Sequence, residues 1–356
     1  MNNRELFQNI MFYRGHDRMP VVHWAEWEET LERWYGEGLP READKRVFLN
    51  AAPHWAGVGI PLNLFPSFPE EILEETEEYR VVRGEDGVVC KSWKKKSCIP
   101  HYIDFTLKTA ADWPRFKERL QPDPGRIPAG LDQALAGAEA GGLPVVIGTA
   151  SLMGWIRNWM GVENMSYLMY DDPGVYADMV DTLAELTCWG LDQVVPRMKN
   201  PPDMGFGWED ICGKSGPLVS PGIFERCVAP GYRRIRARLE GHGTRLLGID
   251  SDGDVEALVG PWLAAGVNVQ FPIEIGTWNG DSMVYRKKYG RDLRIIGGFN
   301  KLVLEKGPDA IDAEIERRLP LMKEGGFMLM PDHIITPGTS LKNYQYFLER
   351  IRSLRF

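Results

Sequence analysis

The sequence lacks the features that mark membrane-spanning and disulfide-rich proteins. No stretch of about 18 consecutive apolar residues exists, so we expect no transmembrane helix. The N-terminal segment has no apolar core of the signal-peptide type. The five cysteines are scattered and form no Cys-x-x-Cys pair, which fits a reducing compartment better than a disulfide framework. These absences predict a cytoplasmic protein with no membrane partner.

Common nucleotide and nucleophile motifs are also missing. The chain contains no Gly-x-Gly-x-x-Gly after an apolar run, no phosphate-binding Gly-x-x-x-x-Gly-Lys-Ser/Thr and no Gly-x-Ser-x-Gly elbow. The 42 basic and 50 acidic residues give a net charge of −8, whereas nucleic-acid binding depends on neutralising phosphates. We therefore expect a small-molecule substrate, no nucleotide cofactor and no nucleic-acid partner.

What the chain does contain is a repeated order of short apolar run, polar loop and amphipathic helix. Runs without alternation suit strands buried on both faces, as in parallel sheets. The eight runs are Val21–Trp24, Val58–Leu64, Val145–Ala150, Met204–Trp208, Arg245–Ile249, Val267–Phe271, Leu293–Phe299 and Phe327–Met330. The pattern predicts an α/β fold, and it favours one (β/α)8 TIM barrel over residues 1–356 rather than a doubly wound sheet.

Two kinds of local signal refine this prediction. Asp172-Pro173 and Ser340 are candidate N-caps of helices whose apolar residues recur at helical spacing. Residues 70–105 break the βα order and predict an inserted β-hairpin that turns at Asp86-Gly87. We interpret this insertion as an excursion from the barrel, placed as a flap over one end.

Acidic residues and histidine follow several of the predicted strands. Active sites of such barrels lie at the carboxyl ends of the strands, so these positions are the candidate site. The residues are Glu209, Asp210, Asp250, Asp252, Glu274 and His333. We assign Glu209, Asp210 and Glu274 to catalysis, with Glu209 or Asp210 acting as the proton donor. A helix cap at Asp252, a salt bridge at Glu209 or Asp210, and a structural hydrogen bond at His333 remain the alternatives.

Substrate-binding candidates come from the first strand and from the tryptophans. His23 follows the first apolar run, although the stretch after it also reads as a helix surface. Large apolar rings can line a pocket for a planar or methylated ligand, and core filling is the default for most of them. We single out Trp208 and Trp278 together with His23 as substrate-binding residues.

Three segments point to a known family. GPLVSPGIFERCVAPGYRRI (216–235) and GGFMLMPDHIITPGTS (325–340) accompany GIDSDGD (248–254), and together they resemble the uroporphyrinogen decarboxylase superfamily. This superfamily includes corrinoid-dependent methyltransferases, and the resemblance implies one barrel with its cleft at the strand carboxyl ends. Uroporphyrinogen decarboxylases carry an Arg-rich RQAGRY-type segment near the N-terminus. The corresponding MPVVHWAEWEETLERW (19–34) lacks it.

The methyltransferase branch implies a metal site. Its thiol-methylating members use a His-x-Cys pair and a later Cys as zinc ligands. These positions align with Asp250, Asp252 and His333, so the resemblance implies a divalent metal such as zinc on two oxygens and one nitrogen. Harder metals also accept such ligands.

Three functions therefore stay open. The first is a methyltransferase that moves a methyl group from a small O- or N-methylated substrate to a separate corrinoid protein. The second is a cofactor-independent decarboxylase, for which Arg157 and Lys301 are candidate cations, although we expect both at the surface. The third is a ligand-binding barrel without chemistry. A homodimer is also left open by the sequence.

Overall fold

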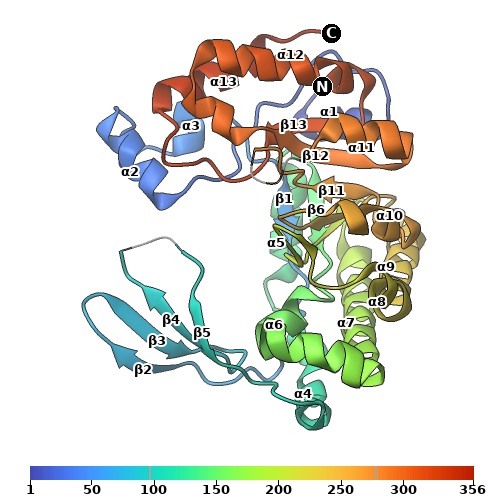
Figure 1. Ribbon diagram of the computed structural model, residues 1–356. Helices are drawn as coiled ribbons and strands as arrows, with labels where there is room; N and C mark the ends of the chain where they lie inside the picture. The colour runs from blue at the N-terminus through green and yellow to red at the C-terminus, as the bar shows by residue number, and fades with distance from the viewer. Residues whose placement is uncertain (96–97, 277, 279) are drawn as a thin grey trace.

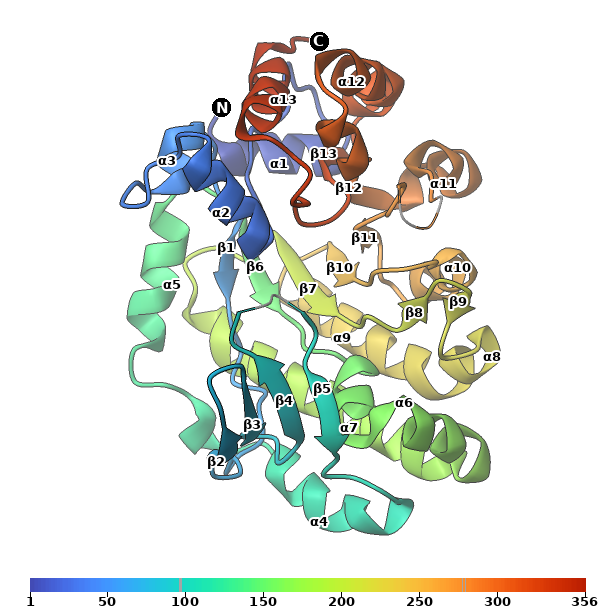
Figure 2. The ribbon, with the colours of Figure 1, turned by 60° about the vertical axis from the view of Figure 1, so that its left-hand side comes forward.

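The computed structural model describes residues 1–95, 98–276, 278 and 280–356. Its centre is a curved sheet of seven parallel strands whose spatial order is the same as their order in the chain (Figures 1 and 2). The strands are β1 (Ala56–Val58), β6 (Val145–Gly148), β7 (Met204–Trp208), β10 (Leu247–Asp250), β11 (Val269–Phe271), β12 (Arg294–Phe299) and β13 (Phe327–Pro331). This arrangement confirms the predicted α/β barrel class. The second predicted strand was misplaced, since β1 ends at Val58, where the expected run begins.

Residues 21–27 occupy the eighth position of the barrel. Val22 forms a parallel bridge to Ala52 before β1, and Glu26 forms another to Ile335 after β13. Backbone hydrogen bonds accompany both bridges, including 2.9 Å from His23 N to Ala52 O. The first predicted run thus links the two edge strands, through single bridges instead of a continuous ladder.

Helices cover the outer face of the sheet (Figure 2). The helices that follow or precede strands are α1 (Asn3–Met11), α2 (Glu28–Gly36), α3 (Lys45–Leu49), α4 (Trp113–Lys117), α5 (Leu131–Ala140), α6 (Gly154–Asp171), α7 (Pro173–Val194), α8 (Pro221–Ile223), η5 (Phe224–Val228), α9 (Ala229–Gly241), α10 (Glu256–Ala264), α11 (Ser282–Tyr289), α12 (Pro308–Glu324) and α13 (Leu341–Ser353). Short 3-10 turns are η1 (Ala110–Asp112), η2 (Glu118–Leu120), η3 (Pro124–Arg126), η4 (Val195–Arg197), η6 (Gly290–Asp292) and η7 (Lys301–Glu305), and β8 (Cys212–Gly213) pairs with β9 (Gly216–Pro217). Both predicted caps are confirmed, because Asp172 accepts from Val175 N and Ser340 accepts from Asn343 N.

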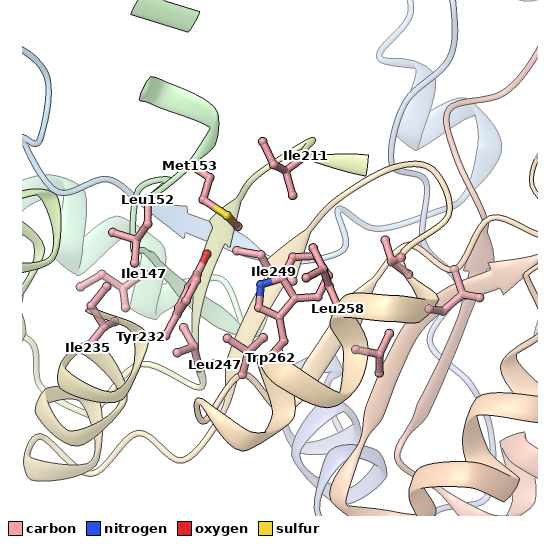
Figure 3. Packing of buried hydrophobic residues seen from close by; sticks show 14 of the residues in the cluster. Ile147, Leu152, Met153, Ile211, Tyr232, Ile235, Leu247, Ile249, Leu258 and Trp262 are labelled. Carbon is pink, nitrogen blue, oxygen red and sulfur yellow. The ribbon is translucent and has the colours of Figure 1, made fainter. Parts of the chain in front are cut away.

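Two apolar clusters hold the barrel together. The outer cluster lies between strands and helices, where Ile147 and Ile249 meet Tyr232 and Trp262 of the covering helices (Figure 3). The inner cluster fills the barrel with side chains from most strands and with two from α1: Phe7, Met11, Val22, Val146, Met204, Leu246, Val269, Phe271, Ile296, Met328 and Met330. Each such side chain contributes roughly 1.5–3 kcal/mol when fully buried. The inner cluster therefore packs the barrel and leaves its carboxyl end for polar residues.

Helix α1 lies at the amino end of the barrel. Arg4 pairs with Asp203 just before β7, at 2.8 Å, and the Asp203 carboxylate also accepts from Val145 N at the start of β6. With this end occupied by α1, the carboxyl ends of the strands are the place for a site, as the sequence predicts.

The insertion at 70–105, here called the flap, is a four-stranded antiparallel sheet rather than a single hairpin. Its strands are β2 (Glu71–Glu75), β3 (Tyr79–Arg83), β4 (Val89–Trp93) and β5 (His101–Asp104). The predicted turn joins β3 to β4, and Gly87 takes a φ of +79° there, a conformation that favours glycine. Figure 1 shows the sheet standing out from the barrel near α4 and α6.

Candidate active site

Three carboxylates follow neighbouring strands and act on one another electrostatically. Asp210 follows β7. Asp250 is the last residue of β10, and Asp252 follows that strand. Burial raises the pKa of Asp250 well above its usual range, and the charges of Asp210, Asp252 and Glu274 raise it further. The pKa of Asp210 is raised in the same way, by burial first and then by Asp252. Asp210 and Asp250 therefore release a proton less readily than an exposed carboxyl group does.

The backbone at Asp210 supports a special role for this residue. Its φ of +44° is in the left-handed region, which costs a non-glycine residue on the order of 1–3 kcal/mol. The carbonyl of Asp210 accepts a hydrogen bond from the guanidinium of Arg157 on α6, and Arg157 NH2 also donates to Asn158 Oδ1 at 3.1 Å. The expectation that Arg157 is a surface residue is therefore wrong. Arg157 is only partly exposed and holds the loop that carries Asp210.

His333 and Asp252 meet from opposite parts of the sequence. His333 Nε2 lies 3.0 Å from Asp252 Oδ2, and the two side chains are 23% and 39% exposed. The ring of Trp24 lies edge-on to that of His333, with 6.1 Å between their centroids. The structure thus brings two of the three predicted metal ligands into direct contact at a place that solvent reaches.

The complete ligand set is not preformed. Among the residues that the structure describes, no group of three or more His, Cys, Asp or Glu side chains is arranged to hold a metal ion. Asp252 and His333 already hydrogen-bond to each other, and with Asp250 they do not form such a group. The side chains as arranged do not fit a metal, so the metal site stays a prediction, and we derive no chemical step through it.

Glu209 is fully enclosed by hydrogen-bond donors. Its carboxylate accepts from Ser151 Oγ at 2.7 Å and from the backbone N–H groups of residues 152, 153 and 154 at 2.8–2.9 Å. The hydroxyl of Tyr232 also donates to it. Burial raises the pKa of Glu209, and the hydrogen bonds from Tyr232 and Ser151 oppose this rise. Because these donors include the first N–H groups of α6, Glu209 fixes that helix on β7.

Glu274 is buried with a cationic partner. Lys301 Nζ lies 3.1 Å from Glu274 Oε1, and both side chains are less than one-tenth exposed. The expectation that Lys301 lies at the surface is therefore wrong. Its backbone N–H donates to Asp332, whose carboxylate also accepts from Ile275 N at 2.6 Å. Asp332 thus draws together the loops after β11, β12 and β13.

The structure does not bring His23 to the acidic cluster. The His23 side chain is fully buried between Tyr344 of α13, at 2.8 Å from its hydroxyl, and Glu26, at 2.7 Å. Glu26 also accepts from Lys45. Since successive residues of a strand point to opposite faces, it is Trp24 that turns into the barrel.

Four aromatic rings pack together inside the barrel. Trp24 meets Phe271 at 4.9 Å between centroids, and Trp55 meets Phe206 at 4.8 Å and Phe271 at 6.1 Å. Phe271 belongs to the inner cluster, and the other three rings pack against it. Sequence reasoning missed Trp55, Phe206 and Phe271. The position of Phe206 two residues before Trp208, on the same strand face, was a usable signal.

The two tryptophans singled out from the sequence lie in loops or at a strand end. Trp208 ends β7, and the Arg157 guanidinium lies 5.9 Å from its ring centroid. Its ring is so close to α6 that a Cβ at Gly154 would fall 2.6 Å from it. Trp278 is partly exposed, while its indole Nε1 is buried and makes no hydrogen bond to the described residues.

Comparisons with known proteins identify the family and the fold of the chain. The uroporphyrinogen decarboxylase (URO-D) family model matches residues 145–354, which is more than half of the chain and includes β6 to α13. The chain belongs to the uroporphyrinogen decarboxylase family. A search of curated proteins gave no match.

Among solved structures, a methyltransferase from Methanosarcina mazei has the same fold. It is 15% identical, the alignment covers 99% of this chain and 98% of that one, and the TM-score is 0.63. A β-L-arabinopyranosidase from Geobacillus stearothermophilus aligns at 10% identity over 88% of this chain and 61% of that one, but its TM-score of 0.28 carries no argument. No described helix has the length and apolar character needed to cross a membrane.

Proposed function

We propose that this protein is an enzyme that transfers a methyl group from a small O- or N-methylated compound to a corrinoid held by a separate protein. The observation that carries the proposal is the group of carboxyls after β7 and at the end of β10, whose pKa values burial raises, with Asp250 beside Phe271 and Trp208 in the sheet register. Membership of the family and the shared fold with a methyltransferase support it.

The chemical need is a better leaving group. When the bond between the methyl carbon and oxygen breaks, the electron pair stays on oxygen, and an unprotonated alkoxide leaves poorly. A carboxyl group that still holds its proton can deliver it to that oxygen as the bond breaks. Asp210 and Asp250 are suited to this role because their pKa values are raised. The resulting carboxylate regains its proton from solvent after the product leaves.

The other side chains position rather than react in this proposal. Glu209 anchors the start of α6, and Arg157 of that helix holds the loop of Asp210. Glu274 accepts from Gly253 N at 3.0 Å and so fixes the turn after Asp252. Trp24 and Trp208 offer apolar surface to the methylated group.

The charge of the site argues against a substrate with several carboxylates. Asp210, Asp250 and Asp252 would repel such a polyanion. The nearby cations are already engaged, since Lys301 pairs with Glu274, and Arg157 donates to Asp210 and Asn158. A neutral or cationic methylated compound meets no such repulsion.

Methyl transfer can be tested directly. The purified protein is mixed with reduced corrinoid protein and a panel of methyl ethers and methylamines, and methylation of the corrinoid is followed by its absorbance. We expect turnover with at least one donor, and a loss of about 100-fold or more in Asp210→Asn. Asp132→Asn is the matched control because the Asp132 side chain is 74% exposed and pairs with Arg197 instead of the acidic cluster. Absence of turnover with every donor, together with a well-folded protein, would overturn the proposal.

A decarboxylase is the second candidate, and the buried Lys301 favours it. A cation close to a buried carboxylate could stabilise the carbanion left after loss of CO2. Release of CO2 by metal-free protein from a carboxylated compound, abolished in Lys301→Met and accompanied by no corrinoid methylation, would replace the first proposal with this one.

A further inference from the structure

A cavity of about 720 Å3 lies away from the candidate active site, where the two ends of the chain meet. Its walls come from α1, from residues 18–21 that lead into the barrel, from α3 with its cap and the segment after it, and from the last turn of α13 with the residues that follow it. Figures 1 and 2 show both termini at the end of the molecule that carries α12 and α13. None of the carboxylates of the acidic cluster lines this cavity.

The charge of this cavity is opposite to that of the whole protein. Four arginines line it, at positions 18, 46, 352 and 355, against a single acidic residue, Asp44. The Asp44 carboxylate is already occupied as the cap of α3, where it accepts from the N–H groups of Arg46 and Val47. Four guanidinium groups thus surround one cavity in a chain of net charge −8.

Two of the four arginines have no acidic partner within the described ranges. The Arg46 guanidinium makes one long hydrogen bond to the described residues, 3.5 Å from Nε to the carbonyl of His23. Arg355 donates only to the carbonyls of Arg352 and Leu354. Their remaining N–H groups are available to an anion.

The other two arginines, Arg18 and Arg352, make more hydrogen bonds and ion pairs, but their charged groups still line the cavity. Arg18 pairs with Asp17, which is 56% exposed, and an exposed pair of this kind contributes little. Arg352 NH2 donates to the carbonyl of Asn50 at 2.8 Å and so fixes the C-terminal segment against the segment after α3. Arg352 is thus a wall of the cavity as well as a source of charge.

We propose that this cavity binds a phosphorylated small molecule. Guanidinium groups match the geometry of phosphate oxygens with paired N–H donors. The volume is within the range of about 300–1,000 Å3 that ligand sites occupy. Apolar side chains on the same wall, among them Leu6, Met19 and Val47, would cover the organic part of the ligand. The site is separate from the proposed methyl transfer, and its occupancy does not depend on that reaction.

Calorimetric titration with inorganic pyrophosphate and with ADP tests the proposal. We expect both to bind the intact protein, with ADP tighter because its organic part contacts the apolar wall. Arg46→Gln and Arg355→Gln should each weaken binding about tenfold or more, since each removes charge-assisted hydrogen bonds. Two separate variants are used so that misfolding of one does not remove the test, and thermal melts of both check the fold.

The control is Arg197→Gln, which removes one positive charge from an exposed pair with Asp132 outside the cavity. Equal weakening in this control would show a general effect of charge and would refute the site. If neither probe binds at about 1 mM, the proposal is also refuted, because a dissociation constant above 1 mM corresponds to a binding free energy of less than about 4 kcal/mol. Binding only to vesicles that contain phosphatidic acid would contradict the assignment to a small molecule in solution.

Discussion

Replacing Glu209 with glutamine should destabilise the protein although the two side chains have the same shape. One carboxylate oxygen accepts from Ser151 Oγ and from the N–H groups of Met153 and Gly154, and the other accepts from Leu152 N and the Tyr232 hydroxyl. The amide oxygen of glutamine can replace the first oxygen. Its NH2 group must then replace the second, where it faces the N–H of Leu152.

The magnitude follows from these contacts. Tyr232 can rotate its hydroxyl to accept from the amide, but Leu152 N–H is left as an unsatisfied buried donor, which costs about 1–3 kcal/mol. The three bonds to the first oxygen also lose their charge assistance. We expect a loss of about 3 kcal/mol in the free energy of unfolding. With about 2.1 cal/mol/K of unfolding entropy per residue, 356 residues give about 0.75 kcal/mol/K, so the midpoint should fall by about 4 °C.

Calorimetry and urea unfolding of Glu209→Gln measure this loss. Tyr232→Phe is the matched comparison, because it removes one donor and leaves Leu152 N–H paired with the carboxylate, for an expected loss of about 1 kcal/mol. Equal stability of Glu209→Gln and the wild type, or a larger loss in Tyr232→Phe, would refute the view that Glu209 anchors the start of α6.

Three further predictions concern the same end of the barrel. Lys301→Met should lower the free energy of unfolding in urea by about 3 kcal/mol, because it leaves Glu274 buried without its partner. The added change Glu274→Gln should restore part of this stability. An unchanged free energy of unfolding in Lys301→Met would show that the pair does not stabilise the fold. Because the pKa of Asp250 is raised in the folded state, the wild type loses stability as pH rises from the unfolded pKa through the folded pKa. Asp250→Asn has no such loss, so its stability relative to the wild type should increase as pH rises from about 4. A relative stability that decreases with pH would contradict a raised pKa. If Asp250, Asp252 and His333 bind a metal, as predicted from the sequence, protein prepared without chelator should contain one equivalent of divalent metal, and His333→Ala should contain none. Active protein free of metal would rule out this ligand set.

The sequence was sufficient for the barrel because its signals are repeated. Short apolar runs followed by capped helices recur along the chain, and caps such as Asp172 and Ser340 depend only on local chemistry. The acids at the strand ends followed from the same reasoning, since parallel strands present their carboxyl ends at one edge. For this reason Asp252 and His333 were expected together, although they are far apart in the chain.

What the sequence could not supply was the direction and partners of individual side chains. A shift of one residue along a strand exchanges its two faces, and an apolar run of four residues does not define that register. The buried contact of His23 with Tyr344 and the inward position of Trp24 therefore had to come from the structure. Burial of Lys301 was equally hidden, because its partner Glu274 follows a different strand.

The pH dependence of methyl transfer by Asp252→Asn is the most direct test of the central claim, that carboxyl groups at the strand ends donate the proton. The charge of Asp252 helps to raise the pKa values of both Asp210 and Asp250, and a proton donor fails as pH rises above its pKa. We predict that the alkaline decline of kcat moves to lower pH in Asp252→Asn and stays in place in the control Asp132→Asn. An alkaline decline at the wild-type pH in Asp252→Asn, with turnover intact, would contradict the account.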